Sequence, residues 1–221
     1  MAEIEVINFA DRPSLLSRYM LELRDVTIQN DPMRFRANLE RIGQIMAYEI
    51  SKRLHYRNEE VTTPLGTAVC QTPADRVVLA TILRAGLPYH HGFLTYFDHA
   101  ENAFVSAYRR YREKGDTFDV VVEYMASPDI EGKTLILVDP MLATGSSMEL
   151  AYKALLNRGV PATIHVASVI ASQQSVEYVR QHFPADRTTL WCGAIDPEIN
   201  AHQYIVPGLG DAGDLAYGEK L

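Results

Sequence analysis

A short apolar run followed by small hydroxyl-bearing residues constrains this chain more than any other stretch. Residues 134–147 read TLILVDPMLATGSS, in which 135–138 form an uninterrupted apolar run that ends at Asp139. A run of this length with β-branched residues is typical of a buried parallel strand. The residues after the turn repeat apolar positions at helical spacing, which predicts a helix over 148–158 with Gly159 as a left-handed C-cap. The order of strand, acidic residue, small-residue turn and helix predicts an α/β fold.

The turn after this strand is suited to binding a phosphate group. A turn of small residues can direct several backbone N–H groups to one point, and a helix N-terminus adds about half a positive charge there. Thr144, Ser146 and Ser147 add hydroxyl donors. Asp139 lies where ligands of open α/β sheets bind and is an acceptor for the hydroxyls of a neighbouring sugar. These four residues therefore predict a site for a sugar phosphate.

A purely structural interpretation of the same turn is open at this point. Ser146 and Ser147 could do no more than cap the helix, and Asp139 could do no more than close the strand. No lysine follows Gly145, as it would in a Walker motif, which disfavours an ATP-hydrolysing P-loop.

A second buried strand ends beside another candidate site residue. Residues 77–83 read VVLATIL, a fully apolar run that leads directly into Arg84-Ala85-Gly86. Arg84 is thus expected at the carboxyl tip of a buried strand, next to small residues that leave room for a ligand. A surface arginine beside a turn would give the same pattern.

Strands and helices alternate from residue 77 to residue 192, which predicts a mostly parallel, doubly wound sheet flanked by helices. Further strands are expected over 103–108, 163–170 and 188–192, and further helices over 88–97 and 171–183.

A charged hairpin, further short strands and an N-terminal helical portion complete the expected fold. Residues 109–119 are crowded with charge between two strands and predict a hairpin that projects into water. One or two short strands broken at 64–66 are expected over 59–70, and 4–9 form an arm or edge strand. Asp31 and Pro32 are typical of a helix start, and the helix they begin is expected to extend to about residue 54.

Length and composition indicate an ordinary globular chain. The 221 residues are enough for one large domain, with a helical portion over 1–60, an α/β core over 77–192 and a glycine-bearing tail over 195–221 that forms a hood over the sheet. The net charge of −7 gives no general attraction to nucleic acid or to an anionic membrane. No secretory signal and no apolar run of membrane-spanning length is visible. Cys70 and Cys192 lack metal-ligand spacing and are expected to be reduced thiols of a cytoplasmic protein.

Four stretches together resemble one enzyme family. Residues 138–145, VDPMLATG, resemble the phosphoribosyl-diphosphate loop of uracil phosphoribosyltransferases, and 204–218, YIVPGLGDAGDLAYG, resemble that family's uracil-binding segment. Residues 82–87, ILRAGL, and 108–109, Tyr-Arg, match two further family sequences in the same order. The resemblance implies a type I phosphoribosyltransferase fold with a hairpin flap and a C-terminal hood. It also implies the transfer of a phosphoribosyl group to N1 of uracil, with UMP and diphosphate as products.

The resemblance implies a role for each matching residue. Arg84 and Arg109 would contact the diphosphate, Asp139 would orient the ribose hydroxyls, residues 143–147 would hold the 5′-phosphate, and Asp211 would reach the ribosyl donor or assist at N1. The residues expected to bind phosphoribosyl diphosphate are Arg84, Arg109, Asp139, Pro140, Met141, Leu142, Ala143, Thr144, Gly145, Ser146, Ser147 and Asp211. The residues expected to bind uracil are Ile205, Gly210, Asp211 and Ala212. The expected catalytic set is Arg84, Arg109, Asp139 and Asp211.

The family also implies partners. Magnesium would arrive with the diphosphate, GTP would be an allosteric activator as in some relatives, and the chain would form a homodimer or a larger homo-oligomer. Pro140 replaces the second acidic residue of phosphoribosyltransferases in general, so no protein ligand for magnesium is assigned. Other departures from the family are Ser146 in place of a second glycine, and the segments 171–174 and 215–217.

Other functions fit the sequence less well. A pyrimidine-sensing RNA-binding regulator on the same fold would need a basic face, which a net charge of −7 without a basic stripe outside the charged hairpin disfavours. A catalytically silent paralogue would not need Arg84, Arg109, Asp139, Thr144 and Asp211. A purine or orotate transferase is disfavoured by the uracil-type C-terminal segment.

Overall fold

The computed structural model describes residues 3–111 and 118–219, and the side chains of these residues except those of 107–122. The predicted tip of the charged hairpin, around Gly115, lies outside the described residues.

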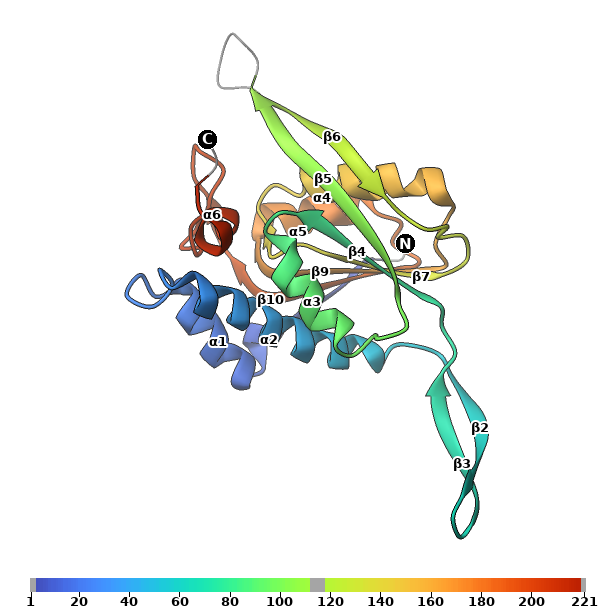
Figure 1. Ribbon diagram of the computed structural model, residues 1–221. Helices are drawn as coiled ribbons and strands as arrows, with labels where there is room; N and C mark the ends of the chain where they lie inside the picture. The colour runs from blue at the N-terminus through green and yellow to red at the C-terminus, as the bar shows by residue number, and fades with distance from the viewer. Residues whose placement is uncertain (1–2, 112–117, 220–221) are drawn as a thin grey trace.

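An eight-stranded sheet forms the centre of the molecule, in the order β1-β10-β9-β7-β4-β5-β6, with β8 paired to β9 (Figure 1). Its strands are β1 (Glu5–Asn8), β4 (Val77–Leu83), β5 (Glu101–Tyr111), β6 (Phe118–Ala126), β7 (Thr134–Val138), β8 (Met141–Leu142), β9 (Thr163–Ser172) and β10 (Thr188–Asp196). All pairs are parallel except β5 with β6. The predicted mostly parallel sheet is confirmed, and the 4–9 segment supplies its edge strand.

Helices cover both faces of the sheet, because the central strands are apolar on both faces. In β7, Ile136 and Val138 pack toward one cluster of buried residues, whereas Leu135 and Leu137 pack toward the other. The first face is covered by α1 (Leu15–Arg24), α2 (Pro32–Ser51) and α3 (Gly86–Leu94), and the second by α4 (Ser146–Leu155) and α5 (Gln173–His182). The doubly wound arrangement is therefore confirmed.

Several predicted boundaries differ in the structure. Helix α4 begins at Ser146 rather than at residue 148, ends at Leu155 and continues as one 3₁₀ turn, η2 (Leu156–Arg158). Gly159 closes that turn with φ 118° and ψ 179°, so the prediction of a left-handed C-cap was wrong. Strand β9 extends to Ser172, where a helix had been expected from residue 171.

Two hairpins leave the body of the molecule (Figure 1). Strands β2 (Tyr56–Thr63) and β3 (Gly66–Pro73) form an isolated two-stranded sheet, and β5 and β6 extend together beyond the central sheet. The strands of the predicted charged hairpin pair as far as Tyr111 and Phe118.

The C-terminal tail is ordered over the carboxyl edge of the sheet, as expected for a hood. It contains β11 (Glu198–Ile199), β12 (Ile205–Val206) and α6 (Ala212–Tyr217), which lies beside the N-terminal end of α2 (Figure 1). The N-terminal end of the chain adds a short 3₁₀ helix, η1 (Phe9–Asp11). No helix among the described residues is long and apolar enough to cross a membrane.

Candidate active site

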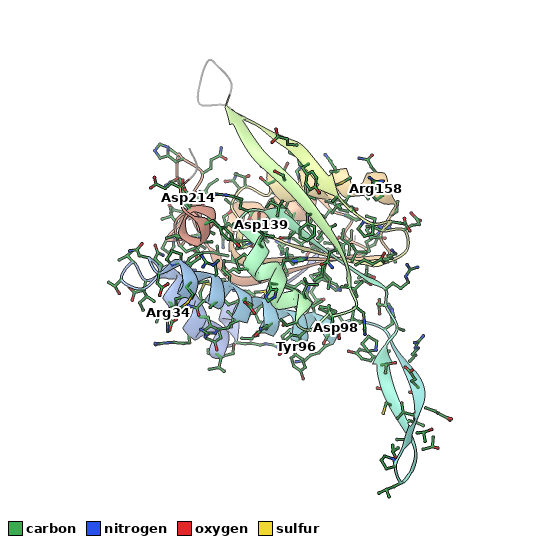
Figure 2. All side chains as sticks on the ribbon, viewed as in Figure 1. Arg34, Tyr96, Asp98, Asp139, Arg158 and Asp214 are labelled. Carbon is green, nitrogen blue, oxygen red and sulfur yellow. The ribbon has the colours of Figure 1, made fainter. Side chains whose placement is uncertain are left out.

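The two segments that carry the sequence motifs meet at the carboxyl edge of the sheet. The backbone N–H of Ala212, in the hood, lies 3.4 Å from Sδ of Met141, in the short strand β8 that follows β7. Figure 2 shows Asp139 near the centre of the molecule and Asp214 on the hood helix α6. Residues about 70 positions apart in the chain thus form one candidate site.

The turn between β8 and α4 has the geometry of an anion-binding loop. Gly145 is the N-cap of α4, with φ 86° and ψ −16°, and no side chain caps the helix. Ser146 and Ser147 are the first two helical residues, which rules out the interpretation that they only cap it. The hydroxyls of Thr144 and Ser146 lie 2.8 Å apart. A helix N-terminus without a side-chain cap leaves N–H groups for a bound anion.

Two serines behind this loop orient its peptide groups. The hydroxyl of Ser172 donates to the carbonyl of Ala143 over 2.6 Å, and that of Ser175 lies 2.6 Å from the carbonyl of Leu142. Because a trans peptide directs its C=O and N–H in opposite directions, the N–H groups of Ala143 and Thr144 point away from α5. Sequence reasoning missed both serines, although S-x-x-S at 172–175 is the signal of the capping box that they form.

Tyr178 packs against the same loop from α5. A Cβ atom added at Gly145 would lie 2.7 Å from the Tyr178 ring. The Tyr178 hydroxyl is hydrogen-bonded to Glu149, on the first turn of α4. The loop is therefore held between two helices and has no room for a side chain at Gly145.

Asp139 follows β7 directly and is only partly exposed. Burial raises the pKa of its carboxyl to about 7, the backbone N–H of Met141 acts in the opposite direction, and the nearby charge of Asp211 raises it further. The effect of Asp211 indicates that two of the predicted site carboxylates lie near each other.

Arg84 reaches from the end of β4 to the hood. Its Nη2 lies 3.2 Å from Oδ1 of Asp214 and 3.3 Å from the carbonyl oxygen of Gly218. The chain passes close to β4 just after Arg84: a Cβ at Gly86 would lie 2.1 Å from Oγ1 of Thr81, so only glycine fits there. Asp214 was not predicted from the sequence, since nothing local links it to a residue 130 positions earlier.

The other predicted residues divide between the hood and the hairpin. Asp211 is the N-cap of α6, and its Oδ1 accepts hydrogen bonds from the N–H groups of Gly213 and Asp214 at 2.8 and 3.0 Å. Ile205 and Ala212 are buried, and Gly210 has φ 89°. Arg109 lies on β5 opposite Val120, but its side chain is outside the described residues.

Two of the predicted site residues at this edge carry carboxylates. Asp139 and Asp211 offer oxygen atoms, which are the donors that magnesium prefers. Within residues 3–111 and 118–219, side chains of 107–122 excepted, no three His, Cys, Asp or Glu residues cluster closely enough to hold a metal alone.

Comparisons with known proteins show the family to which this chain is similar. Residues 11–219 match the family model described as uracil phosphoribosyltransferase. The uracil phosphoribosyltransferase of Porphyromonas gingivalis is 66% identical over 218 residues, which cover 99% of this chain and 100% of that protein. The enzyme of the same name from Methanothermobacter thermautotrophicus is 44% identical over 85% of each chain.

A solved structure supports the fold. The AQ2163 protein from Aquifex aeolicus superposes with a TM-score of 0.85 at 26% identity, over 96% of this chain and 98% of that one. Sequence and structure together show that the chain belongs to the uracil phosphoribosyltransferase family.

Proposed function

We propose that this protein transfers the phosphoribosyl group of 5-phospho-α-D-ribose 1-diphosphate to N1 of uracil, with UMP and diphosphate as products, in pyrimidine salvage. The observation that carries the proposal is the contact between Met141 and Ala212. It brings an anion-binding loop and a glycine-bearing segment to the same edge, where a phosphorylated sugar and a base could lie next to each other.

The proposed roles follow from the charge that develops during the reaction. The ribose carbon becomes cation-like as diphosphate leaves, so the site must hold the sugar, neutralise the leaving group and exclude water. The N–H groups of 143–147 would bind the 5′-phosphate, with Pro140, Met141 and Leu142 shaping the loop. Asp139 would accept from the ribose hydroxyls, and Arg84 and Arg109 would contact the diphosphate. When bound, magnesium would neutralise part of the diphosphate charge.

The hood would present uracil to this centre. Uracil is small and neutral, so its donor and acceptor edge suits exposed backbone groups such as those of Ile205, Gly210 and Ala212. Asp211 would face the ribosyl donor or N1 of the base; its use of one oxygen as an N-cap supports a rigid placement of the carboxylate.

The direct test of this function is product formation. The protein is mixed with magnesium, phosphoribosyl diphosphate and each free nucleobase in turn, and nucleotides are separated by chromatography. We expect UMP from uracil and no nucleotide from hypoxanthine, guanine or orotate. Formation of a purine nucleotide or orotidylate at a comparable rate would contradict the proposal.

Cytosine is expected to be rejected. It presents a donor where uracil presents an acceptor, so a backbone N–H that pairs with uracil would face another donor. Mismatches of this kind can reduce kcat/KM by about 10⁴-fold. A turnover of cytosine within tenfold of that of uracil, in the same assay, would show that the hood does not read this edge of the base.

The raised pKa of Asp139 predicts a pH dependence. The ribose hydroxyls need the carboxylate form, so kcat/KM for phosphoribosyl diphosphate should rise as pH increases through about 7, the pKa of this group. Asp139→Asn removes the titrating group and should flatten this rise. A rise caused by titration of the substrate would instead persist in this variant. A rise that persists unchanged in Asp139→Asn would contradict the assignment.

Asp139 also makes the stability of the ligand-free protein depend on pH. As pH rises, Asp139 ionises near its ordinary pKa of 3.8 in the unfolded state, but only near 7 in the folded state. The contribution of Asp139 to the free energy of unfolding is therefore complete below about pH 4 and is lost as pH rises to about 7. Thermal melts of the ligand-free protein and of Asp139→Asn across this range measure it.

We also propose that the chain forms a homo-oligomer in the cytoplasm, with GTP as an activator. The β2–β3 hairpin supports the first part, because it stands away from the body (Figure 1) and exposes Tyr56, Val61, Leu65 and Val69. Light scattering should give a mass above the 24.8 kDa of one chain; a single chain mass at assay concentration would contradict this. Addition of GTP to the assay tests activation.

An RNA-binding regulator is the second candidate. No observation on the described part of the chain favours it, and a salt series of RNA binding would detect it.

A further inference from the structure

An ion pair outside the predicted site holds the backbone of the hood. Arg24, the last residue of α1, forms two parallel hydrogen bonds with Asp196, the last residue of β10: Nη1 to Oδ2 is 2.7 Å and Nη2 to Oδ1 is 2.8 Å. The Asp196 side chain is 8% exposed and that of Arg24 is 25% exposed. Bidentate pairs of this kind fix direction as well as distance.

Both backbone groups of Gly208 bind to this ion pair. The N–H of Gly208 donates to Oδ2 of Asp196 over 2.8 Å, and its carbonyl accepts from Nη1 of Arg24 over 3.0 Å. Burial acts to raise the pKa of Asp196, but the hydrogen bonds from Arg24 and Gly208 outweigh it and leave the pKa below its ordinary value. The carboxylate is therefore charged whenever the enzyme works near neutral pH.

Gly208 lies in a turn that only glycine fits. It has φ 62°, and a Cβ at this position would lie 2.0 Å from the carbonyl oxygen of Ile205. The turn places Ile205 on one side and Gly210 to Ala212 on the other, which are the residues proposed to contact uracil. A rotation at Gly208 would thus move one side of the base pocket relative to the other.

Other side chains from the N-terminal helical portion hold the same segment by its carbonyls. Nε2 of Gln29 donates to the carbonyl of Leu209 over 3.1 Å, and Nη1 of Arg36 donates to that of Ala216 over 2.6 Å. The hood is consequently held along its length by α1, α2 and the loop between them.

We infer that Arg24, through its bidentate pair with Asp196, is a positioning residue for uracil: it sets the Ile205–Gly208 turn and thereby the backbone that reads the base. This inference rests on the proposed function of the hood. It assigns a role in base recognition to the N-terminal helical portion, which carries none of the sequence motifs.

Lysine is the informative replacement, because it keeps the charge but cannot reach Asp196 with two parallel hydrogen bonds and Gly208 as well. A displacement of about 1 Å in a binding group can cost about 100-fold. We therefore expect Arg24→Lys to raise KM for uracil by about tenfold or more, while KM for phosphoribosyl diphosphate changes by less than about twofold.

Arg34→Lys is the matched control. Arg34 also forms a bidentate pair with a buried carboxylate, Glu22, at 2.9 and 3.0 Å, but among the described residues it makes no hydrogen bond or ion pair with the hood. Both variants should melt at lower temperature, whereas only Arg24→Lys should change KM for uracil. Equal changes in the two variants, or an unchanged KM for uracil in Arg24→Lys, would overturn the inference.

A milder variant keeps the test decisive if Arg24→Lys does not fold. Gln29→Met removes the donor to the carbonyls of Leu209 and Leu23 with little change in volume. It should raise KM for uracil by about threefold, with KM for phosphoribosyl diphosphate unchanged. An unchanged KM for uracil in Gln29→Met would then overturn the inference. The unsubstituted enzyme separates the two claims: if it does not convert uracil, the proposed function fails, and if it does while the variants match it, only the positioning role fails.

Discussion

Replacement of Arg84 by methionine is expected to lower kcat/KM for phosphoribosyl diphosphate by about 30- to 1,000-fold, because loss of one charged contact to a developing anion typically costs about 2–4 kcal/mol. Arg84 lies at the carboxyl tip of β4, where it reaches Asp214 and the carbonyl of Gly218. Methionine keeps the apolar part of the side chain and removes only the guanidinium.

Arg76→Met is the matched control for Arg84→Met. Arg76 precedes the same strand at its opposite end and pairs with Glu101 at 3.6 Å on the surface. In steady-state kinetics with varied phosphoribosyl diphosphate, Arg76→Met should have the same kcat/KM as the unsubstituted enzyme. An Arg84→Met enzyme within threefold of the unsubstituted one would remove Arg84 from the proposed diphosphate site.

Gly145→Ala is the second variant with a large expected effect. Gly145 has φ 86°, a conformation that costs an L-residue about 1–2 kcal/mol, and the new Cβ would lie 2.7 Å from the Tyr178 ring. The loop must then move away from α5, and the N–H groups of Ala143 and Thr144 move with it. We expect kcat/KM for phosphoribosyl diphosphate to fall by about 100-fold, since misplacement of a binding group by about 1 Å has this effect.

Gly132→Ala separates backbone strain from crowding. Gly132 also has a left-handed φ, 65°, but a Cβ there would have no atom within 4 Å. It should cost stability in a thermal melt and leave kcat/KM unchanged. If Gly145→Ala behaves like Gly132→Ala, the loop between β8 and α4 does not bind the substrate in the manner proposed.

The sequence predicts the buried elements of this fold well. Strand β4 has the predicted bounds of 77–83, because an uninterrupted apolar run leaves no other place for its side chains. Helix α2 begins at Pro32 after the Asp31 cap, as predicted. The start of α4 was placed two residues late, since the hydroxyl residues after Gly145 were assigned to the turn.

Long-range contacts limited the prediction of the site. Asp214 contacts Arg84, and three further side chains contact residues 142–145: Ser172, Ser175 and Tyr178. In each case the partner lies far away in the sequence, so no local spacing connects the two. The hood was expected to be ordered, but its secondary structure was not predicted. Its two-residue strands and six-residue helix are too short to show a repeating pattern of apolar residues in the sequence.

A crystal structure with UMP tests the central claim most directly. The account predicts the phosphate of UMP against the N–H groups of residues 143–147, the ribose hydroxyls at Asp139, and the uracil ring against Ile205 and Gly210 to Ala212. Density for UMP at another place on the protein, or none at a saturating concentration, would contradict it.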